Sequence, residues 1–176
     1  MFDSQVLAFA IAAALLTVAP GVDTMLVVRN TLARGVSAGL ITTLGVCLGT
    51  FVHATFSALG LSVILLQSAN AWEVLKFAGA GYLVYLGIRS LIQAFSTKPN
   101  SIETVSNRKS QIGFLEGLLN NILNPKTAVF YLAPFPQFID TNDPFLAKSM
   151  LLASIHFLEA VCWLAIVVMC VGKVKV

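Results

Sequence analysis

The chain of 176 residues has too few charged side chains for a protein that folds in water. Hydrophobic residues make up 57% of it and Asp, Glu, Lys and Arg only 11%, and its mean hydropathy is +0.86. Because a soluble domain carries roughly 25% charged residues, this composition excludes a soluble globular fold and predicts an all-α transmembrane bundle. The formal net charge of +3 is too small to indicate a nucleic-acid partner.

The three cysteines, Cys47, Cys162 and Cys170, all lie in apolar stretches. They form no CxxC motif and have no Cys/His spacing typical of a metal site. We therefore expect them to be buried as small hydrophobic side chains rather than to form a disulfide. We expect neither a metal site nor a bound cofactor.

Five apolar stretches are each long enough to cross a bilayer as an α-helix, which needs about 20 residues. They cover residues 6–28, 40–66, 74–95, 112–138 and 145–171. The first is not typical of a cleavable signal peptide, because its N-terminus holds Asp3 without Lys or Arg and no A-x-A-like site follows. The sequence therefore predicts one transmembrane domain with five spanning helices.

A polar stretch, residues 96–111, separates a first half, residues 1–95, from a second half, residues 112–176, and is typical of a flexible linker. Positive residues follow the first, third and fifth predicted helices, whereas the alternate loops hold few. These residues are Arg29, Arg34, Arg89, Lys98, Arg108, Lys109, Lys173 and Lys175. The positive-inside rule therefore predicts a cytoplasmic linker and C-terminus and an outside N-terminus.

Two of the five apolar stretches are interrupted by a proline beside polar residues. The first stretch contains Ala19-Pro20-Gly21-Val22-Asp23, and the fourth contains Asn121-Ile122-Leu123-Asn124-Pro125-Lys126-Thr127. Proline removes a backbone donor and ends or kinks a helix. In lipid, the freed groups must face protein or a watery cavity. Either break alone could also be an ordinary structural kink.

The positions of the two breaks favour a transporter. Each lies in the first helix of its half, and an odd number of crossings between them inverts the second half. In such inverted repeats, paired broken helices place a substrate site near the middle of the membrane. The predicted substrate-binding residues are Pro20, Gly21, Asp23, Asn124, Pro125 and Lys126.

The chemistry of the second break suits a carboxylate. Asn124 is a favoured N-cap and Pro125 a favoured first helical residue, so a helix N-terminus with Lys126 in its first turn would point into the membrane and attract an anion. Asp23, three residues past Pro20, could bind a substrate ammonium or a proton. The alternative is that Asp23 and Lys126 only neutralise each other.

Further polar residues in the predicted spans are candidates for a substrate or proton pathway, because charge is costly in lipid. Glu116, Asn120 and Asn124 are spaced four residues apart and share one helix face. His156 and Glu159 lie three residues apart on the fifth helix, close enough to pair and to relay a proton. The alternative for both sets is that they only stabilise helix packing.

Glycines at four-residue spacing predict close approach of helix backbones. The pairs are Gly35/Gly39, Gly45/Gly49 and Gly113/Gly117. His53 continues the Gly45/Gly49 stripe, and we expect it to pack at a tight helix crossing rather than to bind a ligand.

Several motifs occur in a fixed order along most of the chain. They are Pro20-Gly21-Val22-Asp23, the glycines Gly35, Gly39, Gly45 and Gly49, the run of residues 75–83 with Tyr85-Leu86-Gly87, Asn124-Pro125-Lys126, and Pro136-Gln137-Phe138. In these motifs and their spacing, residues 19–138 resemble the LysE/RhtB family of bacterial amino-acid exporters. The resemblance implies a protein of the bacterial inner membrane that exports amino acids or close derivatives, of the homoserine, threonine or lysine type, in exchange for protons.

The chain departs from that family at its end. Members usually run to about 200 residues or more and carry a further C-terminal hydrophobic segment, whereas this chain stops at Val176. On a plan of three plus three helices, the last helix is missing. We therefore weigh two alternatives, a shortened and inactive membrane protein and a five-helix form that assembles as a homo-oligomer.

Two other function classes compete with an exporter. An intramembrane hydrolase is not supported, because the chain has no HExxH or GxSxG motif and only one aspartate within its predicted spans. A cation transporter could take oxygen and imidazole ligands from Asp23, His53 and Glu159. The fixed positive charge of Lys126 at the second break argues against it.

Overall fold

The computed structural model describes residues 3–67, 110–140 and 142–174, together with residues 74, 77, 81, 84, 85 and 88. This part of the chain is helical, with no strand, which confirms the predicted all-α bundle. Its elements are α1 (Ser4–Val18), α2 (Val22–Arg34), α3 (Val36–Gln67), α5 (Ser110–Ile122), α6 (Pro125–Leu132), the 3₁₀ helix η1 (Phe135–Phe138) and α7 (Phe145–Val174).

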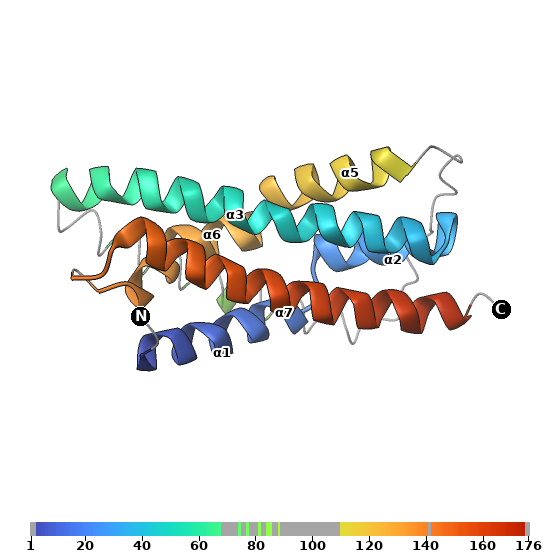
Figure 1. Cartoon of the computed structure of the whole chain (residues 1–176), viewed down its shortest axis with the longest axis horizontal. Coiled ribbons are helices and arrows are strands. Elements are labelled where there is room, and N and C mark those ends of the chain that lie inside the picture. The colour runs from blue at the N-terminus through green and yellow to red at the C-terminus, as the bar shows by residue number, and fades with distance from the viewer. Residues whose placement is uncertain are drawn as a thin grey trace.

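The two longest helices, α3 and α7, pack against each other and run along most of the molecule (Figure 1). The shorter helices lie against them: α5 packs on α3, α1 packs on α7, and α2 contacts α3, α5 and α7. The N-terminus of α1 and the C-terminus of α7 lie toward opposite ends of the bundle (Figure 1). This arrangement brings the two broken stretches together in its interior.

Within the described residues, α3 and α7 are each long and apolar enough to cross a membrane, and α1 and α2 together meet the same test if the bent pair is counted as one span. Helices α5 and α6 have only 13 and 8 residues, because the fourth predicted span is divided by its break. Most of the third predicted span, residues 74–95, lies outside the described residues. So does the predicted linker, residues 96–111, apart from its last two residues, which belong to α5.

Both predicted helix breaks are confirmed. Helix α1 ends at Val18 and α2 begins at Val22, with a bend of 51° between them. Helix α5 ends at Ile122 and α6 begins at Pro125. In each case a proline sits at the interruption, where its missing N–H cannot continue the helical hydrogen bonds.

Glycines determine how closely α3 and α5 pack. A Cβ at Gly45 would overlap the backbone of Phe114, and a Cβ at Gly117 would overlap the backbone of Thr42. The predicted close approach is therefore confirmed for these two positions. For Gly35 the packing prediction is wrong, because an added Cβ would meet nothing within 4 Å, and the residue has φ +91° and forms the turn between α2 and α3.

The hydrophobic interior forms two clusters. One surrounds Phe9 of α1, whose ring lies 5.8 Å from that of Phe130 and 5.6 Å from that of Phe135. The other joins α2, α3 and α7 around Val27 and Leu164. Because edge-on and tilted aromatic contacts of this kind stabilise packing, the first cluster fixes α1 against α6.

The cysteine prediction is only partly confirmed. Cys47 of α3 is fully buried, as expected, but Cys162 and Cys170 of α7 are exposed. The physical reason is that an apolar face of a spanning helix can point outward to lipid, so an apolar sequence context does not imply burial within the protein.

Candidate functional site

A cavity of about 50 Å³ lies where the two helix breaks meet. The first break contributes Gly21 and Asp23 to its wall, and the second contributes Asn124 and Lys126. These four residues were predicted to bind substrate from two stretches that are about 100 positions apart in the chain. The structure therefore brings the two breaks to one place.

Helices α3 and α7 complete the wall of the cavity. Cys47 and Thr50 come from α3, and His156 and Leu164 come from α7. The wall thus combines one carboxylate, one ammonium group, several hydroxyls and amides, and apolar side chains. A space of this size holds a few water molecules.

Asp23 is held by three asparagines from the second half of the chain. Its Oδ1 accepts a hydrogen bond of 2.6 Å from the Asn120 amide, and its Oδ2 accepts bonds of 2.8 Å from Asn121 and 2.7 Å from Asn124. A buried charge is stable only when polar groups replace its water. The three amide groups therefore hold the carboxylate in position at the first break.

Lys126 contacts the end of α1 rather than a carboxylate. Its Nζ donates to the backbone carbonyls of Leu16, at 2.5 Å, and Ala19, at 2.6 Å. The last carbonyls of a helix have no partner within that helix, and a cation is favourable beside them. In the part of the chain that the structure describes, no hydrogen bond or ion pair joins Lys126 to Asp23.

Asn124 has two roles, one at each break. Its Oδ1 accepts a bond of 3.0 Å from the backbone N–H of Lys126, which caps α6, while its amide nitrogen donates to Asp23. Pro125 is the first residue of α6, as the sequence predicts. The N-terminus of α6 is therefore formed as expected, and its cap is connected directly to the first break.

Asn121 was missed by the sequence analysis, although it forms part of the site. It is buried, donates to Asp23, and its backbone carbonyl contacts His53 Nε2 at 3.0 Å. Its position beside Asn120 and three residues before Asn124 was a usable signal. Three amides within one and a half helical turns are unusual in an otherwise apolar helix.

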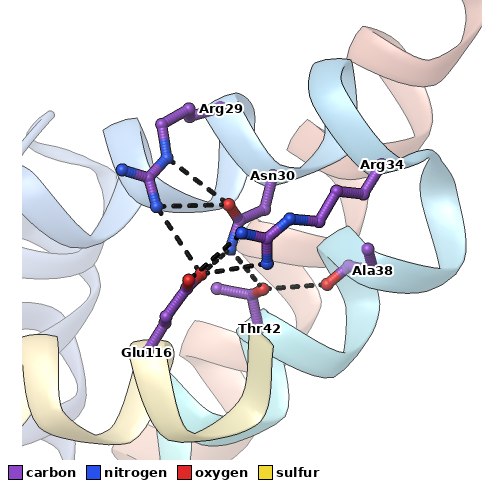
Figure 2. A network of polar contacts seen from close by, with 6 residues as sticks. All are labelled: Arg29, Asn30, Arg34, Ala38, Thr42 and Glu116. Carbon is purple, nitrogen blue, oxygen red and sulfur yellow. Dashed lines mark hydrogen bonds and ion pairs between the residues drawn. The ribbon is translucent and has the colours of Figure 1, made fainter. Parts of the chain in front are cut away.

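Glu116 does not share the surroundings of Asn120 and Asn124, although the spacing predicts one common face. It forms a two-bond contact with Arg34 and lies 3.5 Å from the Arg29 guanidinium, in the network of Figure 2. Glu116 does not line the described cavity. Glu116 instead pairs with the arginines of α2, because removing paired charges from water costs less free energy than removing single ones.

His156 pairs with a tyrosine rather than with Glu159. Its Nδ1 and the hydroxyl of Tyr131 share a hydrogen bond of 3.0 Å, and the two rings stack. Tyr131 also stacks against His53. Among the described residues no hydrogen bond joins Glu159 to His156, and the Glu159 Oε2 atom has no partner. A role for either residue in proton transfer stays a prediction.

The expected ligands of a cation transporter do not gather. Among the described residues, Asp23, His53 and Glu159 do not form a group that could hold a metal ion. Asp23 instead faces amide donors, and His53 contacts a backbone carbonyl. Asp23 and His53 therefore have separate hydrogen-bond partners.

A second charged cluster surrounds the N-terminus of α1. The buried Lys148 Nζ lies 2.5 Å from an Asp3 oxygen and 3.1 Å from an Asp143 oxygen. The hydrogen bond from Lys148 holds the pKa of Asp3 below its usual value, so the pair is ionised at neutral pH. The carboxylates of Asp3, Asp140 and Asp143 lie within 4.8 Å of one another, and the Lys148 ammonium occupies this cluster.

An apolar helical bundle with paired broken helices and an internal polar cavity defines a polytopic membrane protein. The chain belongs to the family described as LysE type translocator, whose profile matches residues 14–175. This confirms the family resemblance seen in the sequence motifs. The family is one of translocators rather than enzymes. No solved structure matches the chain.

Three relatives illustrate the similarity. The chain is 35% identical to an uncharacterized membrane protein, YrhP, of Bacillus subtilis (strain 168), over 97% of this chain and 85% of the relative. It is 36% identical to an uncharacterized membrane protein of Vibrio cholerae serotype O1, over 78% of this chain and 66% of the relative. It is 30% identical to the homoserine/homoserine lactone efflux protein of Salmonella typhimurium, over 82% of this chain and 69% of the relative.

Proposed function

We propose that the chain exports amino acids or close derivatives, of the homoserine, threonine or lysine type, across the bacterial inner membrane in exchange for protons. One observation carries this proposal: the two helix breaks meet at a single cavity that holds one carboxylate and one ammonium group. An amino acid carries the complementary pair of charges. Membership of a translocator family and the similarity to a homoserine/homoserine lactone efflux protein support it.

Asp23 would bind the ammonium group of the substrate. A carboxylate offers about four acceptor positions, and three are used by asparagine amides. An incoming ammonium could take the remaining position without displacing the groups that fix Asp23. Pro20 and Gly21 shape this side of the site by ending α1 just before the first turn of α2.

Lys126 would bind the carboxylate of the substrate. At present its ammonium contacts two neutral carbonyls at the end of α1. Charge-assisted bonds to a carboxylate are stronger than bonds to neutral acceptors, and the N-terminus of α6 at Asn124 and Pro125 adds its own positive dipole end. Substrate binding would therefore draw Lys126 from α1, which couples occupancy of the cavity to the position of that helix.

His156 is the proposed proton-binding residue. It lines the same cavity as Asp23 and Lys126, and an imidazole can bind and release a proton. A protonated ring there would repel the substrate ammonium, so proton and substrate would compete for one site, as exchange requires. Glu159, three residues further along α7, remains a candidate for delivering the proton.

An efflux assay tests the proposal. Cells loaded with dipeptides accumulate free amino acids, and we expect expression of the chain to lower the internal concentration of at least one of them. Asp23→Asn and Lys126→Ala should each reduce efflux at least tenfold at equal membrane abundance. Lys173→Gln, which removes a cation from the exposed end of α7, is the matched control and should export like the parent.

Two outcomes would contradict the proposal. Unchanged internal pools for every amino acid assayed would exclude export by this chain. The orientation, with an outside N-terminus and a cytoplasmic C-terminus, is tested separately by reporter fusions at the two ends. A cytoplasmic signal from an N-terminal reporter would show that the proposed membrane topology is wrong.

A further inference from the structure

Two ion-pair clusters lie toward opposite ends of the bundle, and each joins the first half of the chain to the second. We name them for the predicted orientation. The inner cluster consists of Arg29, Asn30, Arg34 and Glu116, and the outer cluster consists of Asp3, Asp143 and Lys148. Neither cluster lines the cavity. Along the chain, each helix break lies between a residue of one cluster and a residue of the other.

The inner cluster connects α2 to α5. Arg34 donates to both oxygens of Glu116, at 3.2 and 3.1 Å, and its side chain is only 5% exposed. Asn30 adds a bond of 2.9 Å to Glu116 and a second bond of 2.9 Å to Thr42 of α3 (Figure 2). Two-bond contacts between arginine and carboxylate are strong and geometrically specific. The cluster therefore holds three helices together at this end.

The outer cluster connects the start of α1 to the start of α7. Lys148 has a fully buried side chain and contacts both Asp3 and Asp143. Asp3 is also the N-cap of α1, because its Oδ1 accepts bonds of 3.0 Å from the backbone N–H groups of Gln5 and Val6. Loss of the Lys148 contact would therefore remove the polar connection between the first turn of α1 and α7.

The two clusters follow the same plan with the halves exchanged. In the outer cluster the acid, Asp3, precedes the first half-helix of the first half, and the cation, Lys148, follows the second half-helix of the second half. In the inner cluster the acid, Glu116, lies on the first half-helix of the second half, and the cation, Arg34, ends the second half-helix of the first half. The two clusters agree in the order of acid and cation but not in exact position, because Lys148 lies on α7 and Arg34 on α2 itself.

We propose that the inner and outer clusters are the two gates of the transport pathway, and that they open alternately. This inference rests on the proposed export function. Both clusters are formed in this structure. Breaking either cluster is costly because a buried cation, Arg34 or Lys148, is left without its counter-ion. A state with both gates open would carry that cost twice, which favours opening one gate at a time.

A native cysteine can report which gate is open. Cys47 lines the cavity and is fully buried, whereas Cys162 and Cys170 are exposed. In a Cys162→Ala, Cys170→Ala background, a membrane-impermeant methanethiosulfonate reagent modifies Cys47 only when the cavity opens to the side that holds the reagent. The assay is run without substrate, on right-side-out and inside-out membrane vesicles.

Weakening one gate should expose the cavity to one side only. We expect Glu116→Gln to raise the rate of Cys47 labelling at least fivefold from the cytoplasmic side and to lower it from the outside. Lys148→Met and Asp143→Asn should do the reverse. The exchanged pair Arg34→Glu with Glu116→Arg should restore the parental rates, and Lys173→Gln should not change them.

The labelling results distinguish clusters that act as gates from clusters that only stabilise the fold. Labelling that rises equally from both sides, or stays unchanged in every variant, would overturn the gates. If Glu116→Gln does not fold, failure of the exchanged pair to restore side-dependent labelling would overturn the inner gate. If labelling of the variants depends on the side but the parent chain exports no amino acid, the two gates are supported and the proposed function is refuted.

Discussion

The two helix breaks look alike in sequence but are stabilised in different ways. The second break has its own cap, because the Asn124 side chain binds the Lys126 backbone N–H and Pro125 begins α6. The first break has no side-chain cap: α2 follows Gly21, and the carbonyls of Leu16 and Ala19 at the end of α1 receive the Lys126 ammonium. The second break therefore supplies donors that the first one lacks.

This difference shows that the site is assembled from one independent break and one dependent break. Asparagine amides at the second break donate to Asp23, and the ammonium group of Lys126 donates to the end of α1. Unpaired polar groups in an apolar interior are costly. The first break should therefore lose its structure when donors of the second are removed, and the reverse effect should be weaker.

The largest effect is expected from Lys126→Met. It leaves two buried carbonyls at the end of α1 without their charged donor, and bonds to charged groups contribute about 1.5–3 kcal/mol each. We expect a lower free energy of unfolding, seen as a lower apparent melting temperature of the purified protein in detergent. Lys126→Arg keeps the cation and should recover most of the loss. Equal stability of Lys126→Met and the parent would show that the first break does not depend on the second.

Gly49→Ala should damage the site through Asn121. A Cβ at Gly49 would overlap the Asn121 side chain, and this side chain holds Asp23. Overpacking of this kind costs about 1–3 kcal/mol, and we expect efflux to fall roughly tenfold because Asp23 loses one of its amides. Gly81→Ala is the control, since its new Cβ would meet no described atom within 4 Å. Similar efflux in the two variants would contradict this explanation.

Asn124→Ser separates the cap of α6 from the support of Asp23. Serine is about as good an N-cap as asparagine, whereas alanine costs about 1 kcal/mol. Serine has no amide to donate to Asp23, however. We therefore expect Asn124→Ser to keep the cap but to lose export and the stability of its bond to Asp23, and Asn124→Ala to unfold at a lower temperature still. Full export by the serine variant would show that the Asn124 amide is not needed at Asp23.

Gly21→Ala should have the smallest effect on stability. Its new Cβ would lie 3.5 Å from Lys126 Cδ, an ordinary contact, and its φ of −153° suits any residue. We expect a change within about 1 kcal/mol. The informative comparison is with export. A large loss of export at unchanged stability would indicate that the Lys126 side chain moves past Gly21 during transport, whereas normal export would exclude that path.

The sequence predicts the breaks well because their signals are local. Proline position, the N-cap preference of Asn124 and the length of each apolar stretch depend on neighbouring residues only. These signals placed the helix ends within a few residues and identified Asp23 and Lys126, which the structure brings to one cavity.

The partners of these residues could not be predicted in the same way. Helix periodicity places Glu116 and Asn120 on one face. It does not show that Glu116 pairs with arginines of α2 while Asn120 binds Asp23. The same holds for His156, whose partner Tyr131 lies 25 positions earlier. Such pairings depend on which helices pack together, and that information is spread along the whole chain.

The shortness of α5 and α6 has a consequence for how the protein is made. At 1.5 Å per residue, their 13 and 8 residues each fall short of a hydrocarbon core about 30 Å thick, and their break carries three asparagines. Insertion of this segment on its own would leave those amides in lipid. The earlier helices offer the partners it needs: α2 presents Asp23, and α3 presents the glycine groove at Gly45. We therefore expect the earlier helices to be in the membrane before α5 and α6 are synthesised, and to provide the contacts that let this segment insert.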